Sequence, residues 1–403
     1  MVIPVSESAE PDDVAAIDAD GDVGSADAGS ADSDPADEPL LSLENVDVHF
    51  EKRSGWSPFA DSERVHAVDD ASLEIGANDI VVLVGESGSG KTTLGKTAIG
   101  LQRPTNGTIR YRGQDIWDAK DGRGPIEIEY RDIRQALQII HQDPSSALNP
   151  ASTVLETLSE PLRERFDDLD AASRRARIYN VLETVNLTPP GDYAARYPHQ
   201  LSGGEQQRVV MTRALLMNPD LVFADEAVSA LDVSLRVEIM DLMLELKDVF
   251  EVSYLLISHN LSNARFFAER ADGRIGIMYL GKLVEIGTSQ EILDNPKHPY
   301  TKILRWATPS LSLLEEDDVG SPPLQKIDIP DATEPPSGCR FHTRCPYARE
   351  ACTQEEPALE SADDGQPVAC FRQYEDHAYW ESDWLDEETA REALAFEERV
   401  RGD

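Results

Sequence analysis

The residues with the clearest chemistry lie between Val81 and Thr93, where the chain reads VVLVGESGSGKTT. The apolar run from Ile80 to Val84 has the length and the branched side chains of a buried parallel strand. It leads into GESGSGKT, which satisfies the pattern G-x-x-x-x-G-K-[ST] at every fixed position. Residues 94–101 then have the pattern of a helix. With a strand before it and a helix after it, this stretch predicts a nucleoside triphosphate site rather than a chance glycine-rich turn.

The residue types in this loop suit phosphate binding. Glycines let the backbone turn its N–H groups inward, and the start of the following helix adds a positive dipole end at the same point. Lys91 can reach the β- and γ-phosphates, and the Thr92 hydroxyl can bind Mg²⁺. The residues expected to contact the nucleotide are Gly85, Glu86, Ser87, Gly88, Ser89, Gly90, Lys91, Thr92 and Thr93.

A pair of acids stands at the end of a second expected strand, from Leu221 to Ala224. Asp225 can hold a metal ion through water, and Glu226 can polarise a water molecule for attack on the γ-phosphate. Two acids at such a place otherwise only cap the next helix. Because they follow a phosphate loop in the same chain, we favour the catalytic interpretation.

Two other strand ends carry polar side chains. A short apolar strand that starts at Leu137 is expected to end at Gln142, whose side chain can bind Mg²⁺ or hold the attacking water. Taken alone, it would be an ordinary loop residue. His259 follows the expected strand Tyr254–Ile257 and can contact the γ-phosphate, although a lone histidine is more often structural. Ligands bind at the carboxyl ends of parallel strands, which favours a functional role for His259.

The stretch LSGGE begins a further helix at Ser202. A helix start opened by glycines is an anion site, but the same residues can serve only as a cap. The anion-site interpretation is favoured because the acid pair Asp225–Glu226 follows LSGGE at a suitable distance along the sequence.

Composition limits the classes of function. The 403 residues are enough for one large domain or two ordinary ones, and no apolar run is long enough to span a membrane. The net charge of −39 argues against direct nucleic-acid binding, which requires a basic face. With only nine lysines, the acidic surface is typical of proteins from a salt-rich cytoplasm. The acidic first residues do not form a secretion signal, so we expect a cytoplasmic protein.

The first residues of the chain, 1–39, contain twelve acids and no bases, and we expect a disordered acidic tail there. Alternating residues over 40–50 predict a half-exposed strand that ends at Phe50. The expected elements elsewhere are a loop insertion over 51–64, a strand over 65–75, a strand pair over 107–116, an exposed acidic loop over 119–131 and a mainly helical stretch over 153–187.

In order and spacing, GESGSGKT, Gln142, LSGGE, LVFADE, SALD and His259 resemble the motif set of ABC transporter ATPases. The resemblance covers about residues 40–372. It implies an α/β fold, with a RecA-like P-loop core, a helical subdomain near 145–215 and an antiparallel β subdomain at the N-terminal end. It also implies ATP and Mg²⁺ as ligands. In this family two such domains dimerise head to tail, with each ATP between one subunit's phosphate loop and the other's LSGGE.

The resemblance assigns roles by position. It implies catalytic roles for Glu226, His259 and Gln142, Mg²⁺ binding by Thr92, Gln142 and Asp225, adenine stacking by Phe50, and ATP contacts across the dimer by Ser202, Gly203, Gly204, Glu205 and Asp232. Two positions depart from the family pattern. Ala227 stands where proline is usual and Asn260 where aspartate is usual, so the turn after the acids lacks the rigid proline of the family pattern.

The C-terminal part narrows the family. NPKHPYTKILRWATPS at 295–310 and GCRFHTRCPYAREAC at 338–352 resemble segments that follow the ATPase core in oligopeptide and dipeptide importers. The loop DPSSALNP and the 51–64 insertion resemble the second of the two paired ATPases in those importers, which favours a heterodimer with a sibling subunit. The expected parts are an ATPase domain over 40–290, an extension over 291–372 and an acidic helical tail over 373–403.

Four cysteines stand in the extension with the spacing C-x5-C-x6-C-x17-C: Cys339, Cys345, Cys352 and Cys370. A reducing cytoplasm does not favour disulfides, and four thiolates suit Zn²⁺ or a [4Fe–4S] cluster. The spacing lacks the C-x2-C pairs common in zinc sites, and the resemblance favours the cluster. Four free buried thiols remain an alternative, and His342 is a further potential ligand.

The expected function is ATP hydrolysis that drives an importer of di- or oligopeptides, from the cytoplasmic face of the membrane. The expected partners are a sibling ATPase, two membrane permeases and an external solute-binding protein. Three alternatives stay open: a soluble ABC ATPase acting on nucleic acid or the ribosome, an importer of nickel or sugars, and a regulator in which the cysteine site gates the ATPase. The sequence does not identify the solute.

Overall fold

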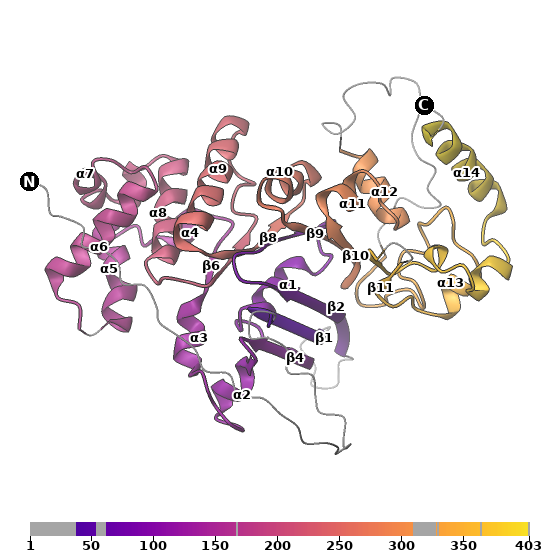
Figure 1. The fold of residues 1–403 in the computed structure, drawn as a ribbon, viewed down its shortest axis with the longest axis horizontal. Coiled ribbons are helices and arrows are strands. Elements are labelled where there is room, and N and C mark those ends of the chain that lie inside the picture. Colours follow the sequence, from indigo (N-terminus) through magenta and orange to yellow (C-terminus); the bar gives the residue numbers. More distant parts are fainter. Residues whose placement is uncertain are drawn as a thin grey trace, which may run out of the picture. The chain divides into compact units, whose positions relative to one another are not determined.

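The computed structural model describes residues 38–53, 62–166, 168–308, 328, 330–362 and 365–401. Nearly all of the expected disordered tail over 1–39 lies outside these residues. The described chain forms two β-sheets (Figure 1). One has four strands in the order β2-β1-β4-β5, and the other has eight in the order β11-β12-β10-β9-β3-β8-β7-β6.

The centre of the larger sheet is parallel and brings the candidate residues to one edge. Its parallel strands are β3 (Ile80–Val84), β6 (Leu137–Ile140), β7 (Leu221–Asp225), β8 (Ser253–Ser258) and β9 (Arg274–Tyr279). The strand β3 is fully buried and alternates between two cores, since Val82 packs with the helices and Val81 packs towards the smaller sheet. This burial on both faces explains its continuous apolar sequence. The strand that was expected to end at Gln142 ends at Ile140, two residues earlier. Gln142 therefore lies in the loop after β6.

The smaller sheet corrects two expectations. Its strands are β1 (Leu41–Arg53), β2 (Ser62–Ile75), β4 (Asn106–Tyr111) and β5 (Gln114–Asp115), and all its pairs are antiparallel. Phe50 does not end β1, because residues 51–53 continue to pair with residues 62–64. The loop over 51–64 was therefore predicted too long, and its centre lies outside the described residues. Backbone pairing continues there although the side chains are polar, since an antiparallel hairpin needs no buried face at its end.

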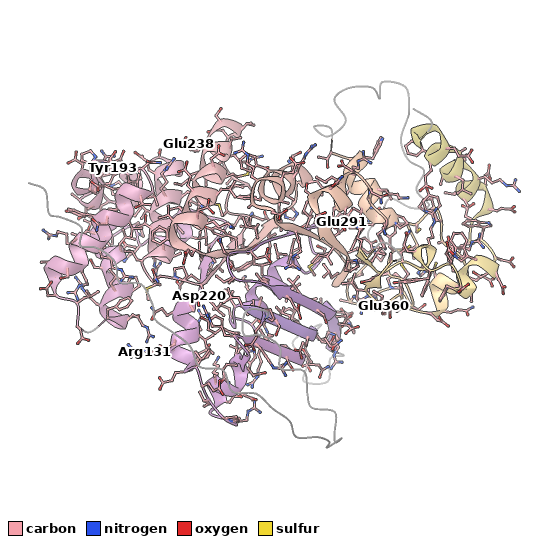
Figure 2. The ribbon with its side chains drawn as sticks, viewed as in Figure 1. Arg131, Tyr193, Asp220, Glu238, Glu291 and Glu360 are labelled. Atoms are coloured by element: carbon pink, nitrogen blue, oxygen red, sulfur yellow. The ribbon has the colours of Figure 1, made fainter. Side chains whose placement is uncertain are left out.

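The two sheets are connected near the start of β7. Tyr111, at the end of β4, donates its hydroxyl hydrogen to Asp220, and Arg112 donates to the same carboxylate at 3.0 Å. Asp220 is labelled in Figure 2 between the two sheets. Burial and the Asp220 contact raise the pKa of Tyr111 to about 12, so the phenol remains a donor at neutral pH.

The segment that was expected to be an acidic loop over 119–131 is an exposed loop from 122 to 129, with a helix at each end. The helix α2 (Ile116–Asp121) enters it, and α3 (Tyr130–Ala136) begins at its end. Asp115 caps α2 by accepting from the backbone N–H groups of Trp117 and Asp118 at 2.8 Å each. The loop was predicted three residues too early because a six-residue helix is too short to show an amphipathic period.

The remaining helices follow the sequence expectation more closely. The helix after the phosphate loop, α1 (Lys91–Ala98), starts earlier than predicted. The region near 145–215 is helical, with α4 (Pro144–Ala147), α5 (Val154–Arg165), α6 (Ala171–Thr184), α7 (Pro190–Ala194), a 3₁₀ turn (Pro198–Gln200) and α8 (Gly203–Leu215). The helices α9 (Val233–Phe250) and α10 (Leu261–Ala271) follow β7 and β8.

The C-terminal part joins the larger sheet. The strand β10 (Lys282–Thr288) pairs with β9 and with β12 (Pro367–Val368), which pairs with β11 (Glu360–Ser361). The sheet therefore extends past the boundary expected at 290. The other elements are α11 (Ser289–Leu293), α12 (Pro299–Trp306), α13 (Ala351–Gln354), two 3₁₀ turns (Phe371–Gln373 and Ala378–Glu381) and α14 (Glu387–Arg401), which lies in the expected helical tail.

Candidate functional site

The loop between β3 and α1 surrounds a pocket of about 200 Å³. Two glycines are required by close backbone contacts. A Cβ at Gly90, which has φ +101°, would lie 2.2 Å from the Ala67 carbonyl oxygen, and one at Gly85 would lie 2.1 Å from the Met278 carbonyl oxygen. The pocket is lined by Val65, Ala67, Ser87, Gly88, Ser89, Gly90, Lys91, Thr92, Thr93, Glu226, His259 and Ala332.

Lys91 is buried inside this loop. Its Nζ donates to the carbonyl oxygens of Gly85 and Glu86 at 2.8 Å each and to Ser89 Oγ at 3.2 Å. Burial lowers the pKa of Lys91 to about 8, against the raising influence of the carboxylates of Glu226, Asp225 and Glu86. The ammonium group is thus surrounded by neutral oxygens, a setting in which an anionic phosphate would be a stronger partner.

The acid pair lies opposite the loop. Thr92 Oγ1 donates to Asp225 Oδ1 at 2.9 Å, and Asp225 is buried. Glu226 has φ +50°, in the left-handed region that residues other than glycine rarely adopt. Such strain of about 1–3 kcal/mol persists where the surrounding structure imposes it, and it is typical of functional sites.

Gln142 and His259 both reach Glu226. Gln142 Nε2 donates to Glu226 Oε2 at 2.9 Å, and His259 Nε2 contacts Glu226 Oε1. The other ring nitrogen of His259, Nδ1, lies 3.2 Å from the carbonyl oxygen of Gly85. The ends of the strands β3, β7 and β8 and the loop after β6 therefore meet at one carboxylate, as the parallel topology predicts.

The residues expected to act across a dimer are not among those that line this pocket. Ser202 caps α8, since its Oγ accepts from the Glu205 N–H at 3.3 Å while its own N–H donates to Glu205 at 2.6 Å. Asp232 caps α9 through the Leu235 N–H at 3.0 Å. The expected residues Ser202, Gly203 and Asp232 are exposed, Glu205 is half-buried and Gly204 is buried.

Phe50 lies beside the pocket rather than in it. Its side chain is 41% exposed, and it pairs in the sheet with Val65, which lines the pocket. An exposed aromatic ring next to the phosphate loop is placed where a base can stack on it.

Several contacts of the loop come from distant parts of the chain and were not predicted. Ala332 lines the pocket, and its carbonyl oxygen accepts from the His66 N–H at 3.1 Å. The Glu86 N–H donates to the hydroxyl of Tyr300 at 2.9 Å, and its carboxylate accepts from Arg344. The sequence indicates only that Arg344 belongs to the C-terminal segment GCRFHTRC. It does not indicate which residue Arg344 contacts.

The four cysteines line one cavity, together with His342 and Tyr379 among others. Cys345 and Cys352 are buried, and Cys339 and Cys370 are half-buried. Burial raises the pKa of all four thiols, that of Cys370 to about 11. For Cys339 and Cys345 the charges of neighbouring cysteines add to this rise. Four thiols gathered in one cavity are a set that a positive centre would stabilise as thiolates.

Among the residues that the structure describes, no helix combines the length and apolar character of a membrane span. A family model described as ABC transporter matches residues 68–229. A second, described as oligopeptide/dipeptide transporter, C-terminal region, matches residues 284–352. These matches cover the nucleotide pocket's loop and acids in the first case, and the first three cysteines in the second.

Similar proteins agree with both models. The oligopeptide transport ATP-binding protein AppF of Bacillus subtilis is 38% identical over 83% of this chain and 97% of its own length. The dipeptide transport ATP-binding protein DppF of Escherichia coli is also 38% identical, over 83% of this chain and 94% of its own. A dimeric structure of the ATP-binding cassette MJ0796, bound to ADP and Pi, has a TM-score of 0.51 and 26% identity over 62% of this chain and 99% of that chain. The chain therefore belongs to the ATPase family of ABC transporters, among members that carry the oligopeptide/dipeptide transporter C-terminal region.

Proposed function

We propose that this chain hydrolyses ATP to drive import of di- or oligopeptides through membrane permeases. The observation that carries the proposal is the convergence of Gln142 and His259 on Glu226, beside the loop that holds Lys91. The C-terminal family match and the relatives named for oligopeptide and dipeptide transport support the solute class.

Hydrolysis would use these side chains in separate roles. The loop N–H groups and Lys91 bind the phosphates, and Glu226 accepts a proton from the water that attacks the γ-phosphorus. The bond from phosphorus to the β–γ bridging oxygen breaks, and ADP and inorganic phosphate leave. Gln142 orients the water, and His259 contacts the γ-phosphate.

The residues near Asp225 fit a magnesium ion. Thr92, Gln142 and Asp225 offer hydroxyl, amide and carboxylate oxygens, and such oxygens together with phosphates are the usual ligands of Mg²⁺. When bound, the ion neutralises charge on the β- and γ-phosphates.

A second ATPase subunit would complete each ATP-binding site. The helix start at Ser202 and Gly203 is exposed and is not part of this chain's own pocket lining, and its N–H groups would form an anion site for the partner's ATP. With Gly204, Glu205 and Asp232 it would close a head-to-tail dimer, and a cassette of related fold is dimeric. A sibling subunit is the favoured partner.

ATP-driven closure would be passed on by residues 142–165 to two permeases at the cytoplasmic face of the membrane. A solute-binding protein would deliver peptide from outside. Within the chain, we assign residues 40–290 to the ATPase domain and 291–372 to the extension, with strand pairing between β10 and β12 joining the two.

The cysteines would hold a [4Fe–4S] cluster rather than Zn²⁺. The four thiols line one cavity, which supports a single centre bound by all of them. Their spacing lacks the C-x2-C pairs common in zinc sites, which favours the cluster. We expect anaerobically purified protein to contain iron and sulfide in equal amounts and little zinc, by elemental analysis and visible absorption. Stoichiometric zinc without iron would contradict the cluster.

The function is tested by affinity purification from native membranes, in high salt because the net charge is −39. Two permeases and a second ATPase should co-purify, and the reconstituted complex should import peptides only with ATP. Recovery of ribosomal or DNA-binding partners without membrane proteins would contradict the transport role and leave the ATPase assignment intact.

A further inference from the structure

Arg344 connects the cysteine segment, residues 338–352, to the phosphate loop. Its two terminal nitrogens donate to the two carboxylate oxygens of Glu86 at 2.8 and 3.1 Å, in a bidentate pair. The Arg344 side chain is 6% exposed. Burial would lower the pKa of Arg344, but the hydrogen bonds and charge of Glu86 outweigh it and raise that pKa. Glu86 belongs to the glycine-rich loop, so this contact acts on the backbone that surrounds the phosphates.

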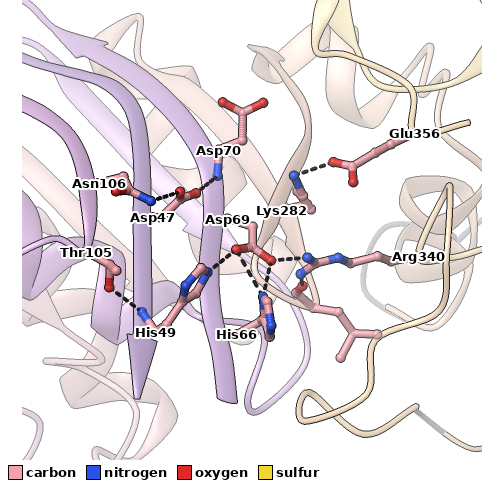
Figure 3. Close-up of polar contacts among 11 residues, drawn as sticks. Asp47, His49, His66, Asp69, Asp70, Thr105, Asn106, Lys282, Arg340 and Glu356 are labelled. Atoms are coloured by element: carbon pink, nitrogen blue, oxygen red, sulfur yellow. Dashed lines mark hydrogen bonds and ion pairs between the residues drawn. The ribbon is translucent and has the colours of Figure 1, made fainter. Parts of the chain in front are cut away.

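Arg340 makes a second contact on the same side of the loop. It donates to the Asp69 carboxylate (Figure 3). It also donates to the Leu280 carbonyl oxygen. The neighbouring Gly281 carbonyl accepts from the Asp69 N–H at 3.0 Å, and the Gly281 N–H donates to the Ser89 carbonyl oxygen at 2.9 Å. Arg340 is therefore connected to the phosphate loop through the backbone of Leu280 and Gly281.

The cluster around Asp69 is a structural junction and not a metal site. His49, His66 and Asp69 lie close enough to share an ion. The carboxylate, however, already contacts His49, His66 at 3.0 Å and Arg340 (Figure 3). Although burial alone would raise the pKa of Asp69, the hydrogen bonds from His49 and Arg340 lower it to about 2. A guanidinium group on this carboxylate would repel a cation, so the cluster joins β1, β2 and the cysteine segment instead.

Both arginines share a tight turn with two cysteines. The His342 N–H donates to the Cys339 carbonyl oxygen at 2.9 Å. The N–H groups of Arg344 and Cys345 both donate to the Phe341 carbonyl oxygen, at 3.0 and 2.9 Å. Since backbone bonds fix Arg344 relative to both thiols, a rearrangement of Cys339 or Cys345 must move the guanidinium group that holds Glu86.

We propose that Arg344, supported by Arg340, positions the phosphate loop, so that nucleotide affinity is coupled to the integrity of the four-cysteine centre. The proposal rests on the nucleotide and cysteine sites proposed above. Loss of the centre would release Arg344 from Glu86 and weaken nucleotide binding. By linkage, bound nucleotide would slow loss of the centre by the same coupling.

The test compares ATP affinity of the full chain, purified anaerobically, before and after removal of iron and zinc with phenanthroline. For the unmodified protein we expect affinity to fall about fivefold or more on removal, the lower end of common coupling factors. Arg344→Gln should bind ATP more weakly than the unmodified protein, with KM raised more than kcat is lowered, and should lose little further affinity with phenanthroline.

Three variants sharpen the comparison. Glu86→Gln should behave like Arg344→Gln, and Arg344→Lys should restore part of the affinity because it keeps the charge without the bidentate geometry. Arg391→Gln breaks an exposed ion pair with Glu387 on α14. Its ATP affinity should equal that of the unmodified protein both before and after phenanthroline treatment. As a reciprocal readout, ADP should slow metal release from the unmodified protein and from Arg391→Gln but not from Arg344→Gln.

Equal losses of affinity with phenanthroline in the unmodified protein and Arg344→Gln would overturn the proposal. So would unchanged ATP affinity in Arg344→Gln, or an anaerobic protein that contains neither iron nor zinc. Absence of any ATP binding by the unmodified protein would instead refute the proposed function, so the two failures are distinguishable.

Discussion

The Thr92 hydroxyl donates a 2.9 Å hydrogen bond to Asp225, although the two residues are 133 positions apart. Thr92 is the second residue of α1, directly after the phosphate loop, and Asp225 ends β7. This bond fixes the distance between the residues that bind the phosphates and the acid pair. Because Glu226 follows Asp225 in the chain, the same bond keeps Glu226 in the lining of the pocket.

Replacing Glu226 by glutamine should abolish turnover and preserve nucleotide binding. The amide keeps the shape and can still contact Gln142, but it does not accept a proton. We expect kcat to fall by about 10²–10⁴-fold, the usual contribution of a general base. Phosphate release measures kcat, and a fluorescent ATP analogue measures affinity. The matched control is Glu245→Gln, an exposed position on α9; near-normal turnover in Glu226→Gln would show that another group is the base.

Nucleotide affinity should decrease as the pH rises from 7 to 9. The pKa of Lys91 is about 8, because burial lowers it. A bound phosphate favours the charged ammonium, so binding near pH 8 should take up a proton. Calorimetry in two buffers of different ionisation enthalpy measures that uptake. A constant affinity over this range, or no proton uptake at pH 8, would contradict the assignment of Lys91 as the titrating group.

Gly95→Ala should destabilise the fold although alanine favours helices. A Cβ at Gly95 would lie 2.1 Å from the ring of Phe223, which is fully buried in β7. Overpacking of this kind costs about 1–3 kcal/mol in the free energy of unfolding. The control Gly191→Ala meets only the Tyr179 hydroxyl, at 3.9 Å, and should change stability by less than about 0.5 kcal/mol. Urea unfolding compares the two, and equal stabilities would show that Phe223 can move aside.

Asp69→Asn should lower stability at neutral pH, because it leaves the buried Arg340 without its carboxylate. Removing one partner of a buried ion pair costs about 3–5 kcal/mol. The folded pKa of Asp69, about 2, lies below its usual 3.8, so the carboxylate stabilises the fold above pH 3.8. This contribution is lost as the pH falls towards 2. The difference in urea midpoint should therefore be constant from pH 5 to 8 and shrink below pH 4; a difference unchanged at low pH would contradict the ionic role.

Much of the nucleotide site could be predicted from local sequence. The phosphate loop, the acid pair and His259 are each adjacent to a short apolar strand, and parallel strands place their carboxyl ends together. The helical stretch near 153–187 was also visible as a pattern. Predictions failed where local signals were weak, as at α2, which is too short to show a period, and at residues 51–53, where backbone pairing extends the hairpin beyond Phe50.

The sequence by itself determined the fold class, the family and the identity of the loop and acid residues, because each depends on residues close together in the chain. Only the tertiary structure decided which side chains support the loop. Arg344 and Glu86 are 258 positions apart, and Tyr300 reaches the same residue from α12. Such pairs follow no period and no motif, since an ion pair depends on where two distant backbones are brought by packing. The connection between the cysteines and the phosphate loop therefore exists only in the folded chain.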